Sequence, residues 1–173
     1  MTHHIRKSTV RMAVVLSLFA ASSAWAASNL VAGDTTMLKN IAQSSMAEIA
    51  TANIALEKST SPQIKTFAQM MIDDHTKALA DTKTLATAKG VDLPDGPDML
   101  HKAAALKLRA LSGDTFDASY VKQSGVADHV ATEKLLKKTQ TGAKDGDLKA
   151  LATQMLPVVQ GHLKHARELP MKK

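Results

Sequence analysis

Hydrophobic residues recur every three or four positions along most of the chain, which is the spacing of an α-helix that buries one face. One such stripe consists of Ile64, Ala68, Met71, His75, Ala78, Thr82 and Leu85. His75 occupies a position on it where the repeat predicts a hydrophobic side chain. Because a buried polar ring costs free energy unless it has polar partners, the pattern predicts a helix with an interior polar site at His75.

Two helices are predicted before residue 90, joined by only a few residues. The first is expected to have Asp34 as its N-cap and to end near Lys58. The second is expected to begin at Ser61 and Pro62, because a serine cap followed by proline at the first helical position is a typical helix start. Gly90 marks its end. So short a connection makes the two helices an antiparallel hairpin.

A second pair of helices is predicted after a long crossover. Turn-forming residues 91–97 and a short helix over residues 98–111 precede a third helix, expected over residues 114–140. A fourth helix is expected to follow the cap Asp147, and Pro157 is expected to kink it. Hairpin, long crossover with a short helix, and hairpin is the connectivity of an all-α, ferritin-like four-helix bundle.

The first 26 residues have the pattern of a secretory signal peptide. Basic residues precede a short apolar run over residues 12–21, and Ala24-Trp25-Ala26 matches a small-x-small cleavage site. A single bundle domain then occupies residues 27–173, with its core over residues 34–169. We therefore expect an exported bacterial protein, periplasmic or secreted after cleavage near Ala26 and Ala27.

Composition and charge exclude several classes of function. The chain has no cysteine, so neither a disulfide nor a thiolate metal site is expected. The net charge of +6 falls to +3 without the three basic residues of the signal, and aromatic residues make up only 3%. Both figures argue against nucleic-acid binding. No apolar run after the signal is long enough for a transmembrane segment.

Four polar residues are predicted to meet in one layer of the bundle core. Counted from the two tight turns, one carboxylate and one imidazole of each hairpin reach nearly the same height: Glu48 with His75, and Asp128 with His162. A weak internal repeat agrees, because residues 43–48 align with residues 123–128. We interpret the four as ligands of a single Zn, Fe or Mn ion. The alternative is a buried hydrogen-bonded network without metal.

The sequence does not favour an enzyme. Ferritin-like two-metal oxidase sites use a Glu-x-x-His motif on two helices. Here Ile72 stands three residues before His75, and Val159 stands three residues before His162. The chain also contains no nucleophile elbow, phosphate loop or dinucleotide signature. We therefore expect a non-catalytic protein with no catalytic residues.

A secondary set of metal-ligand candidates comprises His129, Glu133, His165 and Asp74. His129 and Glu133 are four residues apart and so share one helix face. His165 lies one turn beyond His162, a spacing that suits a surface metal. We expect this set at partly exposed helix edges.

Four motifs are distributed along the predicted bundle: Met46-Ala47-Glu48, Phe67-Ala68-Gln69-Met70-Met71-Ile72-Asp73-Asp74-His75, Leu111-Ser112-Gly113-Asp114, and Leu156-Pro157 followed by His162-Leu163. Together they resemble a secreted bacterial family catalogued as a domain of unknown function, number 4142, whose members are often labelled outer membrane proteins. The resemblance covers about residues 34–169. It implies a ferritin-like fold and export, and it implies no established activity.

Two functions remain open at this point. One is an exported, non-catalytic bundle that acts in the cell envelope, for example under stress, by contacting an envelope polymer or another protein. The other is a periplasmic metal-binding or metal-buffering protein that uses the interior histidine and carboxylate cluster. Whether added metal stabilises the protein distinguishes the two functions.

Overall fold

The computed structural model describes residues 29–170, so the predicted signal peptide over residues 1–26 lies outside the described residues. In order, the described chain forms α1 (Ala32–Lys58), α2 (Pro62–Ala88), α3 (Met99–Ala110), α4 (Gly113–Tyr120), the π-helix η1 (Val121–Asp128), α5 (His129–Gly142) and α6 (Gly146–Glu168). Within this range no strand is present. None of these helices combines the length and the apolar character that a membrane crossing requires.

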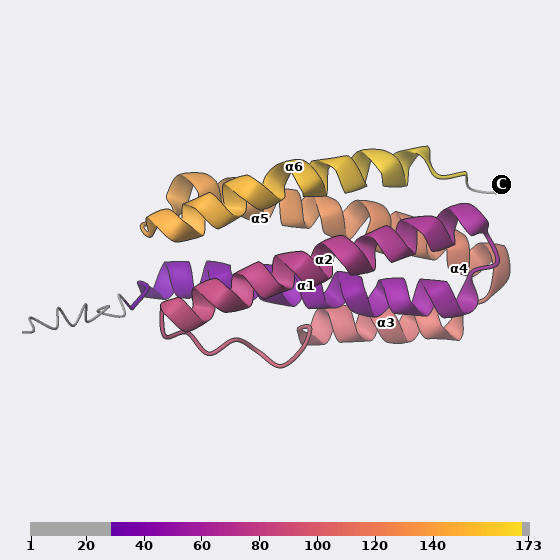
Figure 1. The fold of residues 1–173 in the computed structure, drawn as a ribbon. Coiled ribbons are helices and arrows are strands. Elements are labelled where there is room, and N and C mark those ends of the chain that lie inside the picture. The colour runs from indigo at the N-terminus through magenta and orange to yellow at the C-terminus, as the bar shows by residue number, and fades with distance from the viewer. Residues whose placement is uncertain (1–28, 171–173) are drawn as a thin grey trace, which may run out of the picture.

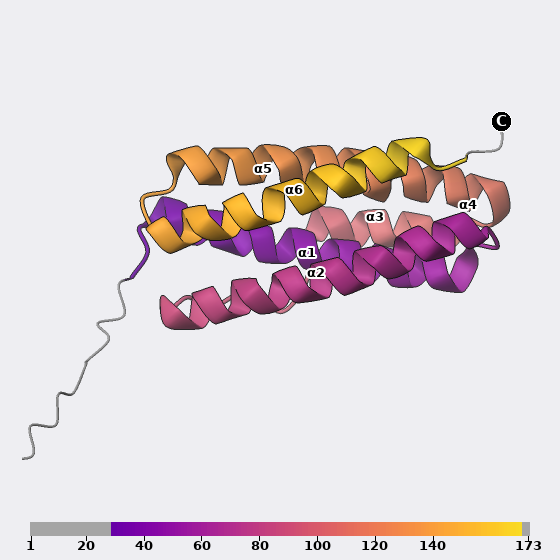
Figure 2. The same cartoon turned by 45° about the horizontal axis from the view of Figure 1, so that its top comes forward.

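Two antiparallel hairpins make up the bundle (Figure 1). α1 packs along α2, and the continuous run of α4, η1 and α5 packs along α6. The hairpins meet through α2 with α6 and through α1 with α5. α3 belongs to the crossover and lies against α1, outside the four-helix core (Figures 1 and 2). This arrangement confirms the predicted all-α, ferritin-like bundle.

Several helix boundaries follow local signals in the sequence. Ser61 Oγ accepts a hydrogen bond from the backbone N–H of Ile64 at 3.4 Å, and Pro62 opens α2. Just beyond α2, Gly90 has a φ of 65°, a left-handed conformation that glycine adopts without a Cβ clash. Asp98 caps α3 by accepting from the first turn of that helix. These boundaries agree with the predicted ones.

Two predicted caps differ from the structure. α1 begins at Ala32, so Asp34 lies in its first turn rather than at the N-cap. The buried Asp34 carboxylate instead accepts hydrogen bonds from the backbone N–H groups of Lys144 and Asp145, both at 2.8 Å. Asp145, and not Asp147, caps α6. Asp34 thus connects the first helix to the turn between α5 and α6, which local capping rules do not describe.

The third predicted helix is continuous but is not α-helical throughout. Its central part, η1, is a π-helix, in which hydrogen bonds span five residues and each turn holds more residues. Its buried residues include Ser124 and Gly125, and the next buried position is His129. An unbroken α-helix would bring Asp128 to this face instead. η1 also approaches α6 closely, since a Cβ added to Gly125 would lie 3.0 Å from the Cβ of Ala166.

The apolar core has two parts that lie on either side of a polar layer. The part towards the α1–α2 turn contains the aromatic residues Phe67, Phe116 and Tyr120. The part towards the other end is aliphatic and includes Leu38, Ile41, Leu136 and Leu148. Along each long helix of the bundle, the buried position between these parts is polar: Glu48, His75, His129 and His162. The fold therefore places the candidate site near the middle of the bundle.

Candidate metal centre

Three histidines from three helices meet in the polar layer. His75 comes from α2, His129 from the start of α5 and His162 from α6. One ring nitrogen of each lies within 4.8 Å of the corresponding nitrogens of the other two, and the residues are 2%, 0% and 3% exposed. Imidazole nitrogen is the commonest protein ligand for transition metals, so the cluster has the composition of a metal site.

A carboxylate on the facing helix determines which nitrogen of His162 carries a proton. His162 Nε2 lies 2.8 Å from Asp74 Oδ2, across the α2–α6 contact. A carboxylate only accepts hydrogen bonds, so Nε2 is the protonated nitrogen. In the neutral ring, Nδ1 then keeps its lone pair. This nitrogen faces His129.

The backbone carbonyl of Ser124 determines the tautomer of His129 in the same way. His129 Nδ1 lies 2.8 Å from the backbone carbonyl oxygen of Ser124 and 3.4 Å from Glu48 Oε1. Because the carbonyl can only accept, Nδ1 carries the proton and Nε2 keeps the lone pair. Ser124 belongs to η1. The π-helix therefore turns His129 inward and also supplies the acceptor that orients its ring.

The two free lone pairs face each other across a short gap. His129 Nε2 and His162 Nδ1 are 3.3 Å apart, and with these tautomers neither nitrogen has a proton to donate. Two lone pairs this close repel each other unless a cation lies between them. A tetrahedral zinc ion with Zn–N bonds of about 2.0–2.1 Å holds neighbouring ligand nitrogens about 3.3 Å apart. The pair thus has the spacing of two ligands on one ion.

His75 supplies the third nitrogen. Its ring centroid lies 5.6 Å from that of His129 and 5.3 Å from that of His162. Neither ring nitrogen of His75 has a hydrogen-bond partner among the described residues, although both are buried. Buried polar atoms are rarely left without a partner. An ion shared by the three rings would satisfy one of these nitrogens.

Burial keeps the three imidazoles neutral. Burial lowers the pKa of His75 well below its usual value, and the neighbouring His129 and His162 lower it further. Burial lowers the pKa of His129 to about 4, against the opposing effect of the bond to Ser124. It also lowers the pKa of His162, against the opposing effect of Asp74. Since metal ligands must be unprotonated, the cluster is in its ligand form at neutral pH.

Glu48 lies on the far side of His129 from the other two rings. Its side chain is buried, and burial raises the pKa of the carboxyl, with a further increase from the charge of Asp128. Glu48 Oε1 approaches His129 Nδ1, the nitrogen that points away from the cluster. The sequence suggested Glu48 as a direct ligand. The structure instead places its carboxyl group next to the outer ring nitrogen of His129, a position that carboxyl groups often occupy behind a metal-bound histidine.

Asp128 is not brought into the cluster. Its carboxylate accepts a hydrogen bond from Gln123 Nε2 at 2.8 Å, and it borders a separate pocket beside His101 of α3. The sequence-based expectation assumed an unbroken α-helical repeat, and η1 shifts the interior register by one residue. Another set of residues with helical spacing on the same helix does match the positions that are buried: His129, Thr132, Leu136 and Thr139.

The secondary candidates divide into two groups. Asp74 and His129 belong to the cluster, through the contacts described above. Glu133 instead pairs with Lys137 at 2.6 Å and accepts a hydrogen bond from Gln160 Nε2 of α6 at 2.9 Å, outside the cluster. His165 is exposed, and its ring packs against an aromatic residue of α2. The structure therefore joins two of the four secondary candidates to His75 and His162.

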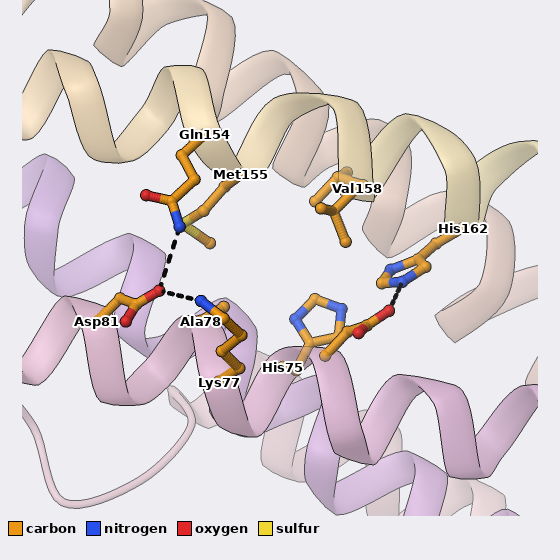
Figure 3. Close-up of a pocket in the computed structure, with 10 residues that line it drawn as sticks. His75, Lys77, Ala78, Asp81, Gln154, Met155, Val158 and His162 are labelled. Carbon is orange, nitrogen blue, oxygen red and sulfur yellow. Dashed lines mark hydrogen bonds and ion pairs between the residues drawn. The ribbon is translucent and has the colours of Figure 1, made fainter.

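A pocket of about 190 Å³ opens beside the cluster between α2 and α6 (Figure 3). His75 and His162 line this pocket, and His129 does not. Apolar side chains of both helices form part of its wall, and Lys77 pairs with Asp81 at 2.9 Å on its lining. The cluster is therefore accessible from the α2–α6 side.

Fold and site together define a class of protein: a ferritin-like helical bundle with a buried three-histidine cluster. Residues 19–169 match the family described as Domain of unknown function (DUF4142), so the chain belongs to that family, as its motifs indicated. Among solved structures, it is similar to a DUF305 fragment from Deinococcus radiodurans, with a TM-score of 0.72 and 11% identity, covering 81% of this chain and 96% of that chain. At this identity the likeness shows the fold alone. No curated protein matches the chain.

Proposed function

We propose that this protein binds a single divalent transition-metal ion with His75, His129 and His162. The observation that carries the proposal is the 3.3 Å separation of His129 Nε2 and His162 Nδ1. These nitrogens do not hydrogen-bond to each other when Asp74 and Ser124 hold the ring protons on the opposite nitrogens. A shared cation turns this repulsive contact into a favourable one.

Zinc fits the donor set best among Zn, Fe and Mn. Three histidines with one open position are an established zinc coordination set. Non-haem iron sites commonly include a carboxylate ligand, and manganese favours oxygen donors. The two carboxylates nearest the cluster, Glu48 and Asp74, contact the outer ring nitrogens of His129 and His162. Nitrogen is therefore the only donor type converging on the shared space among the described residues.

The decisive experiment compares two adjacent residues. Zinc present at about 100–1,000 times its Kd is expected to raise the free energy of unfolding by about 2.7–4.1 kcal/mol. His129→Ala should abolish this increase, whereas Asp128→Ala and the surface control His165→Ala should keep it. Thermal unfolding with zinc and with chelator measures the effect.

Two results would contradict the proposal. An identical melting temperature with zinc and with chelator in the wild-type protein would leave only a hydrogen-bonded network. If Asp128→Ala lost the zinc effect and His129→Ala kept it, the ligand would be Asp128, as an unbroken helical repeat predicts, and not His129. Elemental analysis of the purified protein provides an independent count of bound metal.

We also propose that the protein works after export, as a metal buffer of the bacterial cell envelope. Buffering requires reversible binding but no reaction, which agrees with the lack of a catalytic motif in the sequence. The signal-like pattern of residues 1–26 supports export. Intact-mass measurement of the exported protein should place its N-terminus at Ala27. A product that retains residues 1–26 would contradict this localisation.

A further inference from the structure

We propose that the bound metal keeps one coordination position open to the pocket between α2 and α6, and that a small monovalent anion binds the metal there. This inference rests on the proposed function, because it requires a metal at the three histidines. It adds a second ligand class and a defined route of entry.

The number of donor atoms leaves a position free. Among the described residues, the cluster offers three ligand atoms, one from each histidine. Zinc takes four ligands, and sites with three protein ligands complete the set with a molecule from solution. Asp74 and Glu48 do not fill the fourth position in this geometry, because their closest contacts are to the outer nitrogens of His162 and His129.

The pocket lies on the side where the fourth position is accessible. His75 and His162 line it, while His129 is not part of the lining and is 0% exposed. Figure 3 shows the His75 ring pointing into the space between α2 and α6. A volume of about 190 Å³ is ample for a ligand of a few atoms, since one water needs only about 10–15 Å³ of such space.

The charges around the pocket favour an anion. A divalent ion together with Lys77 outweighs Asp74 and Asp81 by one positive charge. One monovalent anion on the metal would balance it. Met155 and Val158 contribute apolar wall to the same pocket, and an apolar surrounding strengthens the attraction between the ion and the anion.

Azide binding to the cobalt-loaded protein tests the inference. Co²⁺ bound by imidazoles absorbs visible light, and its spectrum changes when an exogenous anion joins the metal. Val158→Trp fills the pocket from α6, whereas Val130→Trp alters a residue of α5 outside the pocket lining, and both valines are 44% exposed. We expect a saturable azide response in the wild-type protein, at least about a tenfold weaker azide affinity in Val158→Trp, and no change in Val130→Trp.

Each other outcome overturns the inference. Cobalt bands without an azide response show a closed coordination sphere, which overturns the inference but leaves the proposed metal binding intact. Equal azide affinity in Val158→Trp and Val130→Trp shows that the anion does not use this pocket. Absence of cobalt bands in the wild-type protein overturns both proposals. If Val158→Trp does not load cobalt, Ala78→Leu fills the same pocket from α2 and provides the same readout.

Discussion

The two hairpins of the bundle contribute different halves of the candidate metal centre. The first hairpin, α1 and α2, supplies His75 and the two acidic residues beside the cluster, Glu48 and Asp74. The second supplies His129 and His162, whose outer ring nitrogens those acidic side chains contact. Each carboxylate–imidazole contact therefore crosses from one hairpin to the other. The three-histidine geometry consequently depends on the docking of the hairpins and is not present in either one alone.

The hairpins also differ in regularity. α1 and α2 are α-helices of 27 residues each, whereas η1 interrupts the corresponding long helix of the second hairpin. In the first hairpin, the interior residues follow the ordinary helical repeat. In the second, the interior histidine follows a π-helical turn, a feature often found at functional sites. A helical repeat therefore locates interior residues only where the helix is uninterrupted.

The largest change in stability is expected when the apo protein is acidified, because His129 of the second hairpin is buried in its neutral form. Burial depresses the pKa of His129 to about 4, while the unfolded residue titrates near pH ~6.5. Between these values the unfolded chain binds more protons, so the free energy of unfolding should fall as the pH falls from 6.5 to 4, by roughly 3 kcal/mol from His129 alone. Urea unfolding in the presence of chelator measures this loss.

Glu48 is expected to oppose the loss of stability in acid. Its carboxyl has a raised pKa, so the native state holds that proton more tightly and gains stability as the pH falls through the raised value. Glu48→Gln removes this opposing contribution. The variant should therefore lose more stability than the wild-type protein on acidification. An equal pH dependence in the two proteins would show that Glu48 titrates normally.

The next effect concerns the close packing of η1 on α6. Gly125→Leu is expected to lower the free energy of unfolding by about 1–3 kcal/mol, because the added side chain meets Ala166 and the Phe67 ring. Gly161 of α6 is the matched control, since nothing lies within 4 Å of a Cβ added there. Gly161→Leu should raise stability by roughly 0.5–1 kcal/mol through better helix propensity. Similar losses in both variants would contradict the close approach at η1.

A third test breaks one carboxylate–imidazole contact between the hairpins. Asp74→Asn should reduce zinc affinity about 10–100-fold, because the partner that orients a metal-bound histidine commonly has an effect of this size. Asp73→Asn is the control, since the exposed Asp73 bonds Gln69 on its own helix. Competition with a chromogenic zinc chelator measures both affinities. Equal affinities would show that Asp74 does not orient His162.

The smallest expected effect lies at the end of the bundle, where Asp34 of the first hairpin binds the α5–α6 turn. Asp34→Ala should cost about 1 kcal/mol, since two backbone N–H groups lose their acceptor. Asp147→Ala should change stability by less than ~1 kcal/mol, because it removes only an ion pair to Lys89 from a side chain that is 73% exposed. Thermal unfolding measures both losses of stability. A larger loss in Asp147→Ala than in Asp34→Ala would indicate that Asp147 is the cap of α6 after all.

The fold and most of the core follow from local features of the amino-acid sequence. The periodic stripes, the Ser61–Pro62 start and the Gly90 stop are local features, because capping and one-sided burial depend on residues a few positions apart. The same periodicity placed Glu48, His75 and His162 in the interior. The long crossover between short-turn hairpins was sufficient to predict a ferritin-like connectivity.

Packing between the helices selects the residues that complete the cluster and orients their side chains. The π-helical turn that replaces Asp128 by His129 is accompanied by the approach of Gly125 to Ala166 on α6 and by the bond from His129 to a carbonyl within η1. Asp74 reaches His162 only because α2 and α6 lie side by side, although the two residues are 88 positions apart. Contacts between segments so distant in sequence leave no periodic signal in either segment, so only the packed bundle specifies them.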